Sequence, residues 1–370
     1  MKKAHLLLTV LSFVLLTSCS NIQGEVPSSG IVQEQEAPVE NEDITLPEEN
    51  PVTNNVNKNN EDEVIIDPVS QIDLSLNPNE LGEIMILMYH GIGDTESDWQ
   101  RTPENFRKDL EYMYQNKYQM ISLNDYAKGE IKTKAGYTPI ILTFDDGRQN
   151  NFNYIEDNGQ LVIDSDCAVG ILEEFKNKYS DFDVTASFFL GTNPFGQKEY
   201  VNEKMNFLVD NGYDIGNHTY SHEKLEMLRS DDIQAEIGSV NNIINSYVPD
   251  YKIETLALPH GSNPKDEYLD YMLEGSYEGK EYKNIAVLDV GWRPAYSPFD
   301  TMNNFKSLYR VTASEIKVDN CGMYDYFKQF EAGSREKFIS DGNSNVVTIP
   351  KKHEEYLNKE MTGEKIINVY

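Results

Sequence analysis

Short apolar runs alternate with stretches of helical periodicity along most of this 370-residue chain. The apolar runs are bounded by turn-forming and polar residues, so they predict buried strands. They cover residues 83–90, 140–144, 184–190, 255–258 and 285–289. Apolar residues at helical spacing predict helices over 102–114, 123–127, 168–179, 203–211 and 230–245. Regular alternation of strands and helices is typical of a parallel α/β architecture.

Polar side chains stand where several of these predicted strands end. In parallel α/β barrels the functional residues gather at the C-terminal ends of the strands. The polar residues that the pattern places there are His90, Asp145, Asp146, His218 and Asp289. These five side chains are therefore the first candidates for a functional site.

The segment Thr-Phe-Asp-Asp-Gly at residues 143–147 directly follows the apolar run 139–142. Two adjacent carboxylates at the mouth of a core are costly unless they are paired or bind a metal. Later in the chain, His218 and His222 are spaced so that both can meet one ion from one side of a helical turn. Two His and one carboxylate form a catalytic zinc set with an open position for water, and the second carboxylate remains free as a base.

These two motifs together resemble those of the polysaccharide deacetylase family, the NodB-homology domain of carbohydrate esterase family 4. The resemblance extends from about residue 83 to at least residue 309, with a motif core at 137–310. It implies a distorted (β/α) barrel of the α/β class. It also implies a hydrolase that uses a divalent metal to remove acetyl groups from sugar amides or esters.

The resemblance assigns roles to individual residues. Asp146, His218 and His222 would bind the metal, and Asp145 would be the general base that activates water there. Zinc suits this ligand set best, although cobalt, nickel or manganese could occupy it. The loop of Pro259, His260 and Gly261 would contact the substrate and supply a backbone N–H to the oxyanion. Trp292 is a further candidate for the sugar groove.

Two features depart from the family pattern. Ala257 stands where the family has an Arg that orients the base, and no replacement can be identified from the sequence. The family's general-acid His lies on a late strand, but the late apolar run 345–350 has no His, and His353 follows it in a charged stretch. His90 follows the first strand instead. Because a barrel closes on itself, a strand moved to the start of the chain can present the same side chain, so His90 is our candidate acid.

The N-terminus has the features of an exported protein. Lys2 and Lys3 precede an apolar run at 6–16, and the Leu-Thr-Ser-Cys sequence at 16–19, in which this run ends, resembles a bacterial lipoprotein box. We therefore expect a signal peptide at 1–18, lipidation of Cys19, and anchoring at the extracellular face of the cell membrane. An ordinary secretory signal is the alternative. Residues 19–80, which are acidic and poor in aromatic residues, predict a disordered tether, and 81–370 the deacetylase-like domain.

The formal net charge of −30 argues against nucleic acid and anionic membrane surfaces as partners. It is compatible with a neutral or cationic polymer, although solubility alone explains it equally well. No protein partner is implied. Cys167 and Cys321 could form a disulfide in an exported domain, but the sequence does not show whether they are close.

Three functions remain open from the sequence. The first is deacetylation of an N-acetylated glycan such as peptidoglycan, poly-N-acetylglucosamine or a chitin-like oligomer. The second is cleavage of O-acetyl esters on a xylan-like glycan, which needs less help at the leaving group. The third is a glycan-binding lipoprotein without activity, and the absent Arg is its main support.

Overall fold

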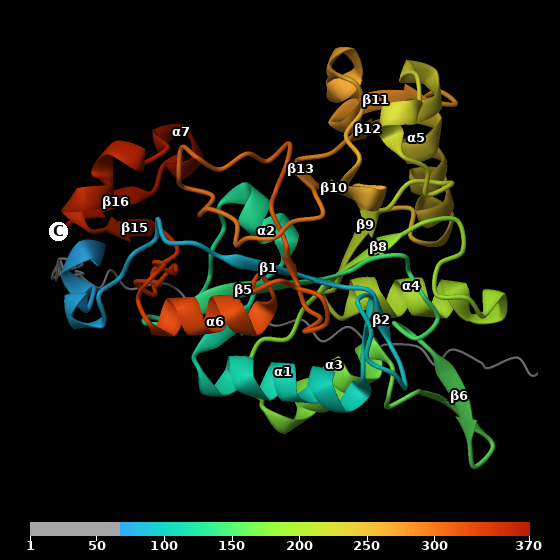
Figure 1. The fold of residues 1–370 in the computed structure, drawn as a ribbon, viewed down its shortest axis with the longest axis horizontal. Coiled ribbons are helices and arrows are strands. Elements are labelled where there is room, and N and C mark those ends of the chain that lie inside the picture. The colour runs from blue at the N-terminus through green and yellow to red at the C-terminus, as the bar shows by residue number, and fades with distance from the viewer. Residues whose placement is uncertain (1–66) are drawn as a thin grey trace, which may run out of the picture. The chain divides into compact units, whose positions relative to one another are not determined.

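The computed structural model describes residues 67–370, which form one compact unit that extends to Tyr370. Its centre is an eight-stranded sheet in the order β13-β10-β9-β8-β5-β1-β14, with β4 paired to β5 beside this path. Every pairing in this sheet is parallel. The sheet curls into a half-barrel (Figure 1), which confirms the predicted α/β barrel-like fold. Its strands are β1 (Met85–Tyr89), β4 (Tyr118–Met120), β5 (Thr138–Phe144), β8 (Ser187–Leu190), β9 (Asp214–Asn217), β10 (Thr255–Ala257), β13 (Ala286–Leu288) and β14 (Val311–Thr312).

Seven α-helices surround or extend this sheet within the described residues. They are α1 (Pro103–Gln115), α2 (Leu123–Lys128), α3 (Ala168–Lys178), α4 (Val201–Asp210), α5 (Ser230–Tyr247), α6 (Met323–Glu331) and α7 (Lys359–Thr362). The start of α1 follows the sequence signal, because the Thr102 side chain caps it by accepting from the N–H of Asn105 and Pro103 fills the first turn. The 3₁₀ helices are η1 (Pro68–Gln71), η2 (Leu74–Leu76), η3 (Lys198–Tyr200), η4 (Leu225–Met227), η5 (Pro259–Gly261), η6 (Asp266–Met272) and η7 (Lys351–Tyr356).

The two faces of the sheet pack against different elements, as the alternation of side chains along each strand requires. On β1 and β5, Leu87 and Leu142 belong to a core that α1, α3, α4 and α6 cover. Ile86 and Ile141 point to the other face, where they pack with α2 and with the C-terminal part of the chain. Thr143 and Asp145 follow Ile141 at intervals of two residues. The alternation of side chains along the strand therefore places them on the same face of the sheet as Ile141.

Four small sheets lie outside the central one. The hairpins β6 (Tyr154–Asp157) with β7 (Gln160–Ile163) and β11 (Glu274–Tyr277) with β12 (Lys280–Lys283) are antiparallel, whereas β2 (Gly91–Ile92) with β3 (Gln100–Arg101) and β15 (Val346–Ile349) with β16 (Ile366–Val369) are parallel. The late apolar run that lacks a His is β15. It pairs with β16 and is not a strand of the central sheet.

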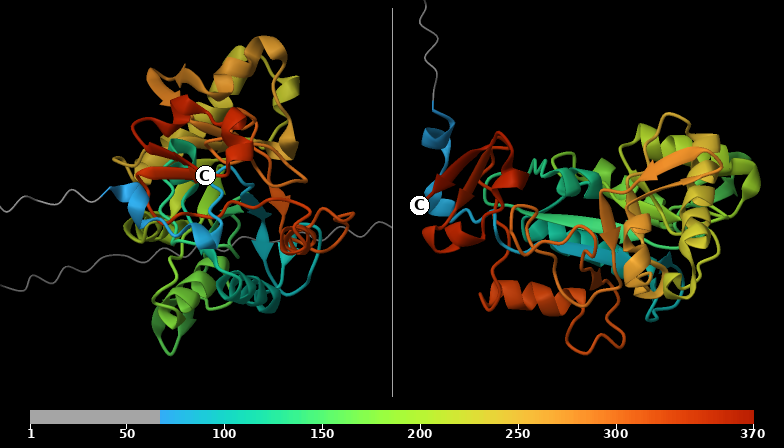
Figure 2. Two further views of the ribbon diagram at one scale, coloured as in Figure 1. Left: turned by 90° about the vertical axis from the view of Figure 1, so that its left-hand side faces the viewer. Right: turned by 90° about the horizontal axis from the view of Figure 1, so that it is seen from above.

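The described chain begins beside its own C-terminal segment (Figure 2). The N–H of Asn79 donates to the carbonyl of Ile339 at 2.8 Å, and the Tyr370 hydroxyl donates to the carbonyl of Pro78 at 3.0 Å. Glu80 is buried and accepts from the N–H groups of Asp341 and Thr348. Residues 67–80 are thus part of the compact unit, whereas the sequence placed the end of the tether near residue 80. The signal peptide, Cys19 and the rest of the predicted tether lie outside the described residues.

No helix between residues 67 and 370 combines the length and the apolar character that crossing a membrane would need. Cys167 and Cys321 are both free thiols, so the disulfide that the sequence left open is not formed.

Candidate active site

Asp146, His218 and His222 meet at the C-terminal edge of the sheet. One carboxylate oxygen of Asp146, Oδ1, lies 3.4 Å from Nε2 of His218 and 3.4 Å from Nε2 of His222. The three ligand atoms lie within 4.8 Å of one another. Two imidazole nitrogens and one carboxylate oxygen, all aimed at one point, are the donor set of a catalytic zinc site with an open position. The residues present therefore fit a divalent transition metal.

Loops position these three side chains. Asp146 follows β5, and His218 follows β9. Asp146, Thr219 and His222 have positive φ values of 73°, 61° and 59°, which non-glycine residues rarely adopt. The prediction that both His lie on a helical turn is therefore wrong. The left-handed backbone of Thr219 and of His222 itself brings the two rings together instead, and such strained backbone is typical of functional sites.

The ring of His218 is fixed from behind. Its Nδ1 lies 2.9 Å from the carbonyl oxygen of Ala257, and the side chain is almost fully buried. A proton on Nδ1 that is donated to this carbonyl leaves Nε2 with a free lone pair on the side of Asp146. Ala257, which stands where the family has an Arg, thus supports the metal set through its backbone.

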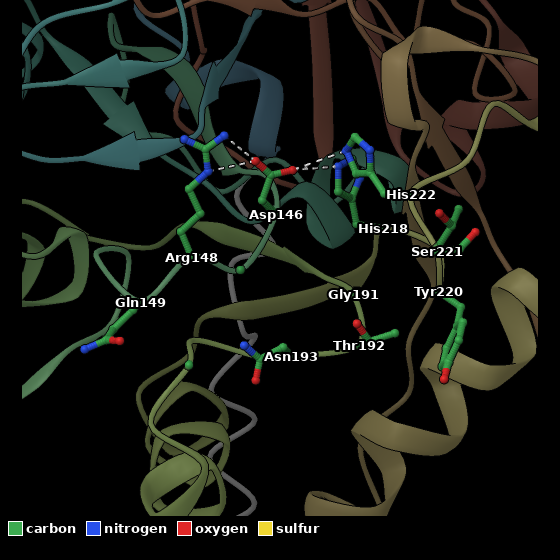
Figure 3. Close-up of a pocket in the computed structure, with 13 residues that line it drawn as sticks. Asp146, Arg148, Gln149, Gly191, Thr192, Asn193, His218, Tyr220, Ser221 and His222 are labelled. Atoms are coloured by element: carbon green, nitrogen blue, oxygen red, sulfur yellow. Dashed lines mark hydrogen bonds and ion pairs between the residues drawn. The ribbon is translucent and has the colours of Figure 1, made fainter. Parts of the chain in front are cut away.

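Arg148 holds the second oxygen of the Asp146 carboxylate (Figure 3). Its Nε and Nη2 lie 2.8 Å and 2.6 Å from Oδ2, while Oδ1 faces the two His rings. Burial alone would raise the pKa of Asp146, but the hydrogen bonds from His218 and His222 outweigh it and hold the pKa far below its usual range. The carboxylate is therefore ionised and ready to bind a cation.

Asp145, the candidate base, is paired with an Arg that the sequence did not identify. Nη1 of Arg310 lies 2.7 Å from Oδ1 of Asp145, and Nη2 lies 2.8 Å from Oδ2. Both side chains are inaccessible to solvent or nearly so. Burial acts to raise the pKa of Asp145, but the charge of Arg310 and then that of His218 outweigh it, so the pKa lies below 3.8. An Arg therefore pairs with Asp145 although position 257 is Ala.

The Arg310 side chain is itself held in place. Its Nε donates to the carbonyl of Asp289 at 2.8 Å, and its Nη1 lies 3.2 Å from Oγ1 of Thr143. Gly291 leaves room for the backbone of Arg310, since a Cβ there would lie 2.4 Å from its N. Asp289, predicted as a strand-end residue, therefore contributes through its backbone. An Arg directly before the short strand β14 was the only sequence signal for this role.

His90 reaches the site through the register of β1 and β5. Tyr89 is aligned with Phe144, so the next residues, His90 and Asp145, end neighbouring strands at the same level. The His90 ring packs on Trp99, with 4.8 Å between the ring centroids. Burial lowers the pKa of His90 to about 4, against the opposing effect of Asp145. The imidazole is therefore neutral at neutral pH.

A hollow of about 390 Å³ brings these groups together. Its lining includes Asp145, Asp146, His218, His222, His90 and His260. A second hollow, of about 380 Å³, lies on the other side of the metal set and shares Asp146, Arg148 and the two His with the first. Figure 3 shows this second hollow with Thr192 and Asn193 on one side and Tyr220 on another.

The loop at 259–261 also lies at this hollow. Pro259 has no N–H, and the N–H of Gly261 donates to the carbonyl of Leu258 at 3.0 Å. Among these three residues, the N–H of His260 is the one without a backbone acceptor. His260 has a positive φ of 59°, and its ring centroid lies 4.8 Å from that of His222.

Two further predicted residues lie apart from the metal set. Trp292 is 69% exposed and lines a neighbouring hollow rather than the one that holds Asp145. Nε2 of His353 lies 2.6 Å from a carboxylate oxygen of Glu336, and His353 lines none of the hollows around the site.

Comparisons with known proteins bear on the same region. The family model for polysaccharide deacetylases matches residues 132–274, which include the two carboxylates, both His of the metal set and the 259–261 loop. No curated protein matches the sequence.

Solved structures with a similar arrangement include several deacetylases. The deacetylase PplD of Streptococcus pyogenes, in complex with acetate, is 17% identical over 67% of this chain and 98% of its own, with a TM-score of 0.49. IcaB from Ammonifex degensii is 16% identical over 67% and 97%, with a TM-score of 0.44. A pseudoenzyme of family CE4 from Bacillus anthracis is 32% identical over 27% and 33%, with a TM-score of 0.21. The family match assigns residues 132–274 to the polysaccharide deacetylase family.

Proposed function

We propose that this chain is a metal-dependent hydrolase that removes acetyl groups from an N-acetylated cell-wall or extracellular polysaccharide. The observation that carries the proposal is the Asp145–Arg310 fork beside the convergent Asp146, His218 and His222. A binding surface has no need for a second, buried carboxylate held by its own Arg. A hydrolase needs such a group as its base.

A divalent metal held by Asp146, His218 and His222 would acidify a water molecule and polarise the acetyl carbonyl. Asp145 then takes a proton from the water as its oxygen attacks the acetyl carbon. Arg310 keeps Asp145 ionised and fixes both of its oxygens, so that the base is ready before substrate arrives. The free N–H of His260 is the donor within the 259–261 loop that suits the oxyanion.

Breaking the C–N bond requires a proton on the departing amine nitrogen. His90 lines the same hollow as Asp145 and is our candidate donor. Because its pKa is about 4, the ring must gain its proton during the reaction, and the proton that Asp145 removed from water is a source that balances the equation. The products are acetate and a free amine on the sugar.

The neutral His90 favours one second candidate, hydrolysis of an O-acetyl ester. A departing alcohol needs less help from a proton donor than a departing amine does. An ester can therefore be cleaved even when most His90 side chains are unprotonated. The third candidate, a glycan-binding protein without activity, rested on the absence of the Arg at position 257. Arg310 removes that support.

The test is acetate release by the full chain from N-acetylated chito-oligomers, peptidoglycan and acetylated xylan. With added zinc, we expect release from the amide substrates that chelator abolishes. Asp145→Asn should retain the metal and lose the release. Release only from xylan would establish the esterase instead. No release from any substrate by the metal-loaded chain would refute both hydrolase functions.

We also propose that the chain is lipid-anchored through Cys19 at the extracellular face of the membrane. The Leu-Thr-Ser-Cys sequence that ends the apolar run supports this. Cys19→Ala should move the protein from the membrane fraction to the soluble fraction of the cell. A Cys19→Ala chain that stays with the membrane would contradict lipidation at this residue.

A further inference from the structure

The ring of His90, the proposed proton donor, is oriented without a hydrogen bond to the protein. Within residues 67–370 neither of its ring nitrogens has a hydrogen-bond partner, and the side-chain bond at this residue runs from Asn151 to the backbone carbonyl of His90. Asp145, by contrast, is fixed by the fork from Arg310. A proton donor must lie within hydrogen-bond reach of the atom that it protonates, so another contact must hold this imidazole.

The side chain that packs on the His90 ring is that of Trp99. The two ring centroids are 4.8 Å apart, and the ring planes are inclined at 55° to each other. Both residues also line the hollow that holds Asp145. The attraction between two aromatic rings at this separation depends on their mutual angle. The contact therefore favours one orientation of the imidazole over the others.

The exposure of Trp99 indicates that its ring is not a core residue. The side chain is 47% exposed, and among the described residues its aromatic partner is His90 alone. An indole that leaves this much apolar area in contact with water adds little to the stability of the fold. The contact with His90 is therefore explained better by a role at the site than by packing.

The backbone of Trp99 is tied to both the acid and the metal set. Its carbonyl accepts from the N–H of Gly91, the residue after His90, at 3.2 Å and from Nη1 of Arg148 at 3.4 Å. Arg148 also holds the carboxylate of Asp146. These contacts fix the place from which the indole reaches the imidazole, and none of them is made by the indole. A substitution of the side chain therefore changes the ring contact and leaves these backbone contacts in place.

The loop between β2 and β3, which carries Trp99, is itself held on two sides. The Ser314 hydroxyl donates to the carbonyl of Ser97 at 2.8 Å. The carboxylate of Glu96 accepts from the N–H of Thr102 at 2.9 Å, directly before α1. The two strands that flank the loop pair with each other. A functional group needs such support, because a loose loop would let the indole and the imidazole move together.

We propose that Trp99 is a positioning residue that holds the His90 imidazole for proton transfer to the departing nitrogen. The inference rests on the proposed function, in which His90 is the donor, and deepens it. Trp99 neither binds the metal nor exchanges a proton, so it acts through His90. The step that it supports is protonation of the leaving amine, and the attack of water on the acetyl carbon proceeds without it.

The dependence of the rate on the leaving group tests this role. The zinc-loaded full chain is assayed on an N-acetylated chito-oligomer, whose amine must be protonated to leave, and on 4-nitrophenyl acetate, whose phenolate leaves without a proton. Trp99→Leu should lower kcat on the oligomer about 10 to 100-fold, the cost of a misplaced catalytic group. Its zinc content and its chelator-sensitive rate on 4-nitrophenyl acetate should match those of wild type. Trp99→Phe keeps a ring against His90 and should restore most of kcat on the oligomer.

A double-mutant cycle shows whether Trp99 acts through His90. In the His90→Asn background, Trp99→Leu should lower kcat on the oligomer no further. An indole that only contacted the sugar would instead lower kcat by the same factor in both backgrounds. Tyr356→Leu is the matched control, because Tyr356 is 43% exposed and lines none of the hollows around the site. It should behave as wild type in each assay.

Nuclear magnetic resonance of the His90 ring provides a measurement without turnover. In the full chain with isotope-labelled histidine, the signal of His90 is identified by its absence from His90→Asn. The ring current of the indole shifts this signal. Trp99→Leu should remove the shift and broaden the line, because the imidazole then samples several orientations. Tyr356→Leu should leave the signal unchanged.

The outcomes separate the two proposals. Wild-type kcat of Trp99→Leu on the oligomer, equal losses on both substrates, or the full loss again in the His90→Asn background would overturn the positioning role while the deacetylase activity stands. Absence of acetate release from every amide substrate would overturn the proposed function. The resonance of His90 then decides whether Trp99 orients this ring, since an unchanged signal in Trp99→Leu refutes the contact in solution.

Discussion

The Arg310–Asp145 fork is the feature on which the proposed chemistry depends most, and Arg310→Lys tests it. The two hydrogen bonds of the fork, at 2.7 Å and 2.8 Å, are both made to an ionised carboxylate. A lysine keeps the positive charge but can replace only one arm of the fork, and it also loses the Nε contact with the Asp289 carbonyl. The Arg310→Lys substitution therefore weakens the contacts that hold the Asp145 carboxylate but leaves the carboxylate in place.

Its magnitude follows from these contacts. One hydrogen bond to a charged group contributes about 1.5–3 kcal/mol. If the ionised form of Asp145 lost this much stabilisation, the pKa of Asp145 would rise by about 1 to 2 units, since one pKa unit corresponds to about 1.4 kcal/mol. The pKa of Asp145 is lowered in the native site, so its active, ionised form is present at all pH values above that low pKa. In Arg310→Lys the loss of activity on the acid side should therefore begin at higher pH.

The assay is the pH profile of acetate release from an N-acetylated oligomer, with zinc content measured at each pH. We expect the acid limb to move upward by about 1 to 2 units and kcat at neutral pH to fall by about 10 to 100-fold, the cost of a slightly misplaced catalytic group. The metal should remain bound. Arg310→Met is a harsher variant, since an unpaired buried carboxylate costs about 3–5 kcal/mol and threatens folding.

Arg101→Lys is the matched control. Arg101 forms a second buried fork, with Nε and Nη2 at 2.8 Å and 2.6 Å from the oxygens of Asp109, and it lines neither of the two hollows that share the metal set. The Arg101→Lys variant should have a lower free energy of unfolding than wild type. The acid limb of its pH profile of acetate release should stay where it is in wild type. An Arg310→Lys enzyme with the wild-type acid limb and full kcat would refute the reasoning, as would equal shifts in both variants.

Three further predictions follow from other contacts. Arg148→Gln removes the contacts that hold Oδ2 of Asp146, so the affinity for zinc should fall about 10 to 100-fold. Competition with a chromogenic chelator measures this affinity. An unchanged affinity would exclude a role for Arg148 at the metal. His90→Asn should reduce kcat on amides by about 10² to 10⁴-fold and on O-acetyl esters by less. His260→Asn keeps its backbone N–H and should retain most activity. If His260→Asn lost more activity than His90→Asn, His260 would be the proton donor. Burial lowers the pKa of Lys204 from 10.5 to about 8, so the unfolded chain binds more protons between these values and stability should rise with pH from about 8 to 10.5. Urea unfolding of wild type and Lys204→Met across that window tests this, because the variant should lack the rise.

The sequence predicted the parts of the site that are local in the chain. The pair Asp145 and Asp146 follows an apolar strand directly, and the structure places both at the end of β5. The same holds for the cap of α1 at Thr102, where the signal lies within a few residues. The geometry of His218 and His222 was less accessible, because spacing alone does not distinguish a helical turn from a loop with two left-handed residues.

Arg310 was beyond sequence reasoning because its partner is set by tertiary structure. Its distance from Asp145 depends on β14 pairing with β1 at Leu87 and Met88, and on β1 pairing with β5. No spacing rule in the chain encodes that order. The one available signal was a physical requirement. Arg310 stands directly before a short strand, and an Arg that is buried there must pair with a carboxylate.

The order of strands in the sheet also determines which side chains meet at the candidate site. A side chain reaches the site because its strand neighbours the right strand, whatever its place in the sequence. β1 lies between β5 and β14, so the residues that directly flank these three adjacent strands, His90, Asp145 and Arg310, come close together although they are distant along the chain. The late strand β15 pairs elsewhere, which leaves His353 outside the site. Under the proposed mechanism, an acid that follows the first strand and an Arg that precedes β14 reach the same carboxylate through the order of strands in the sheet, not through their order in the chain.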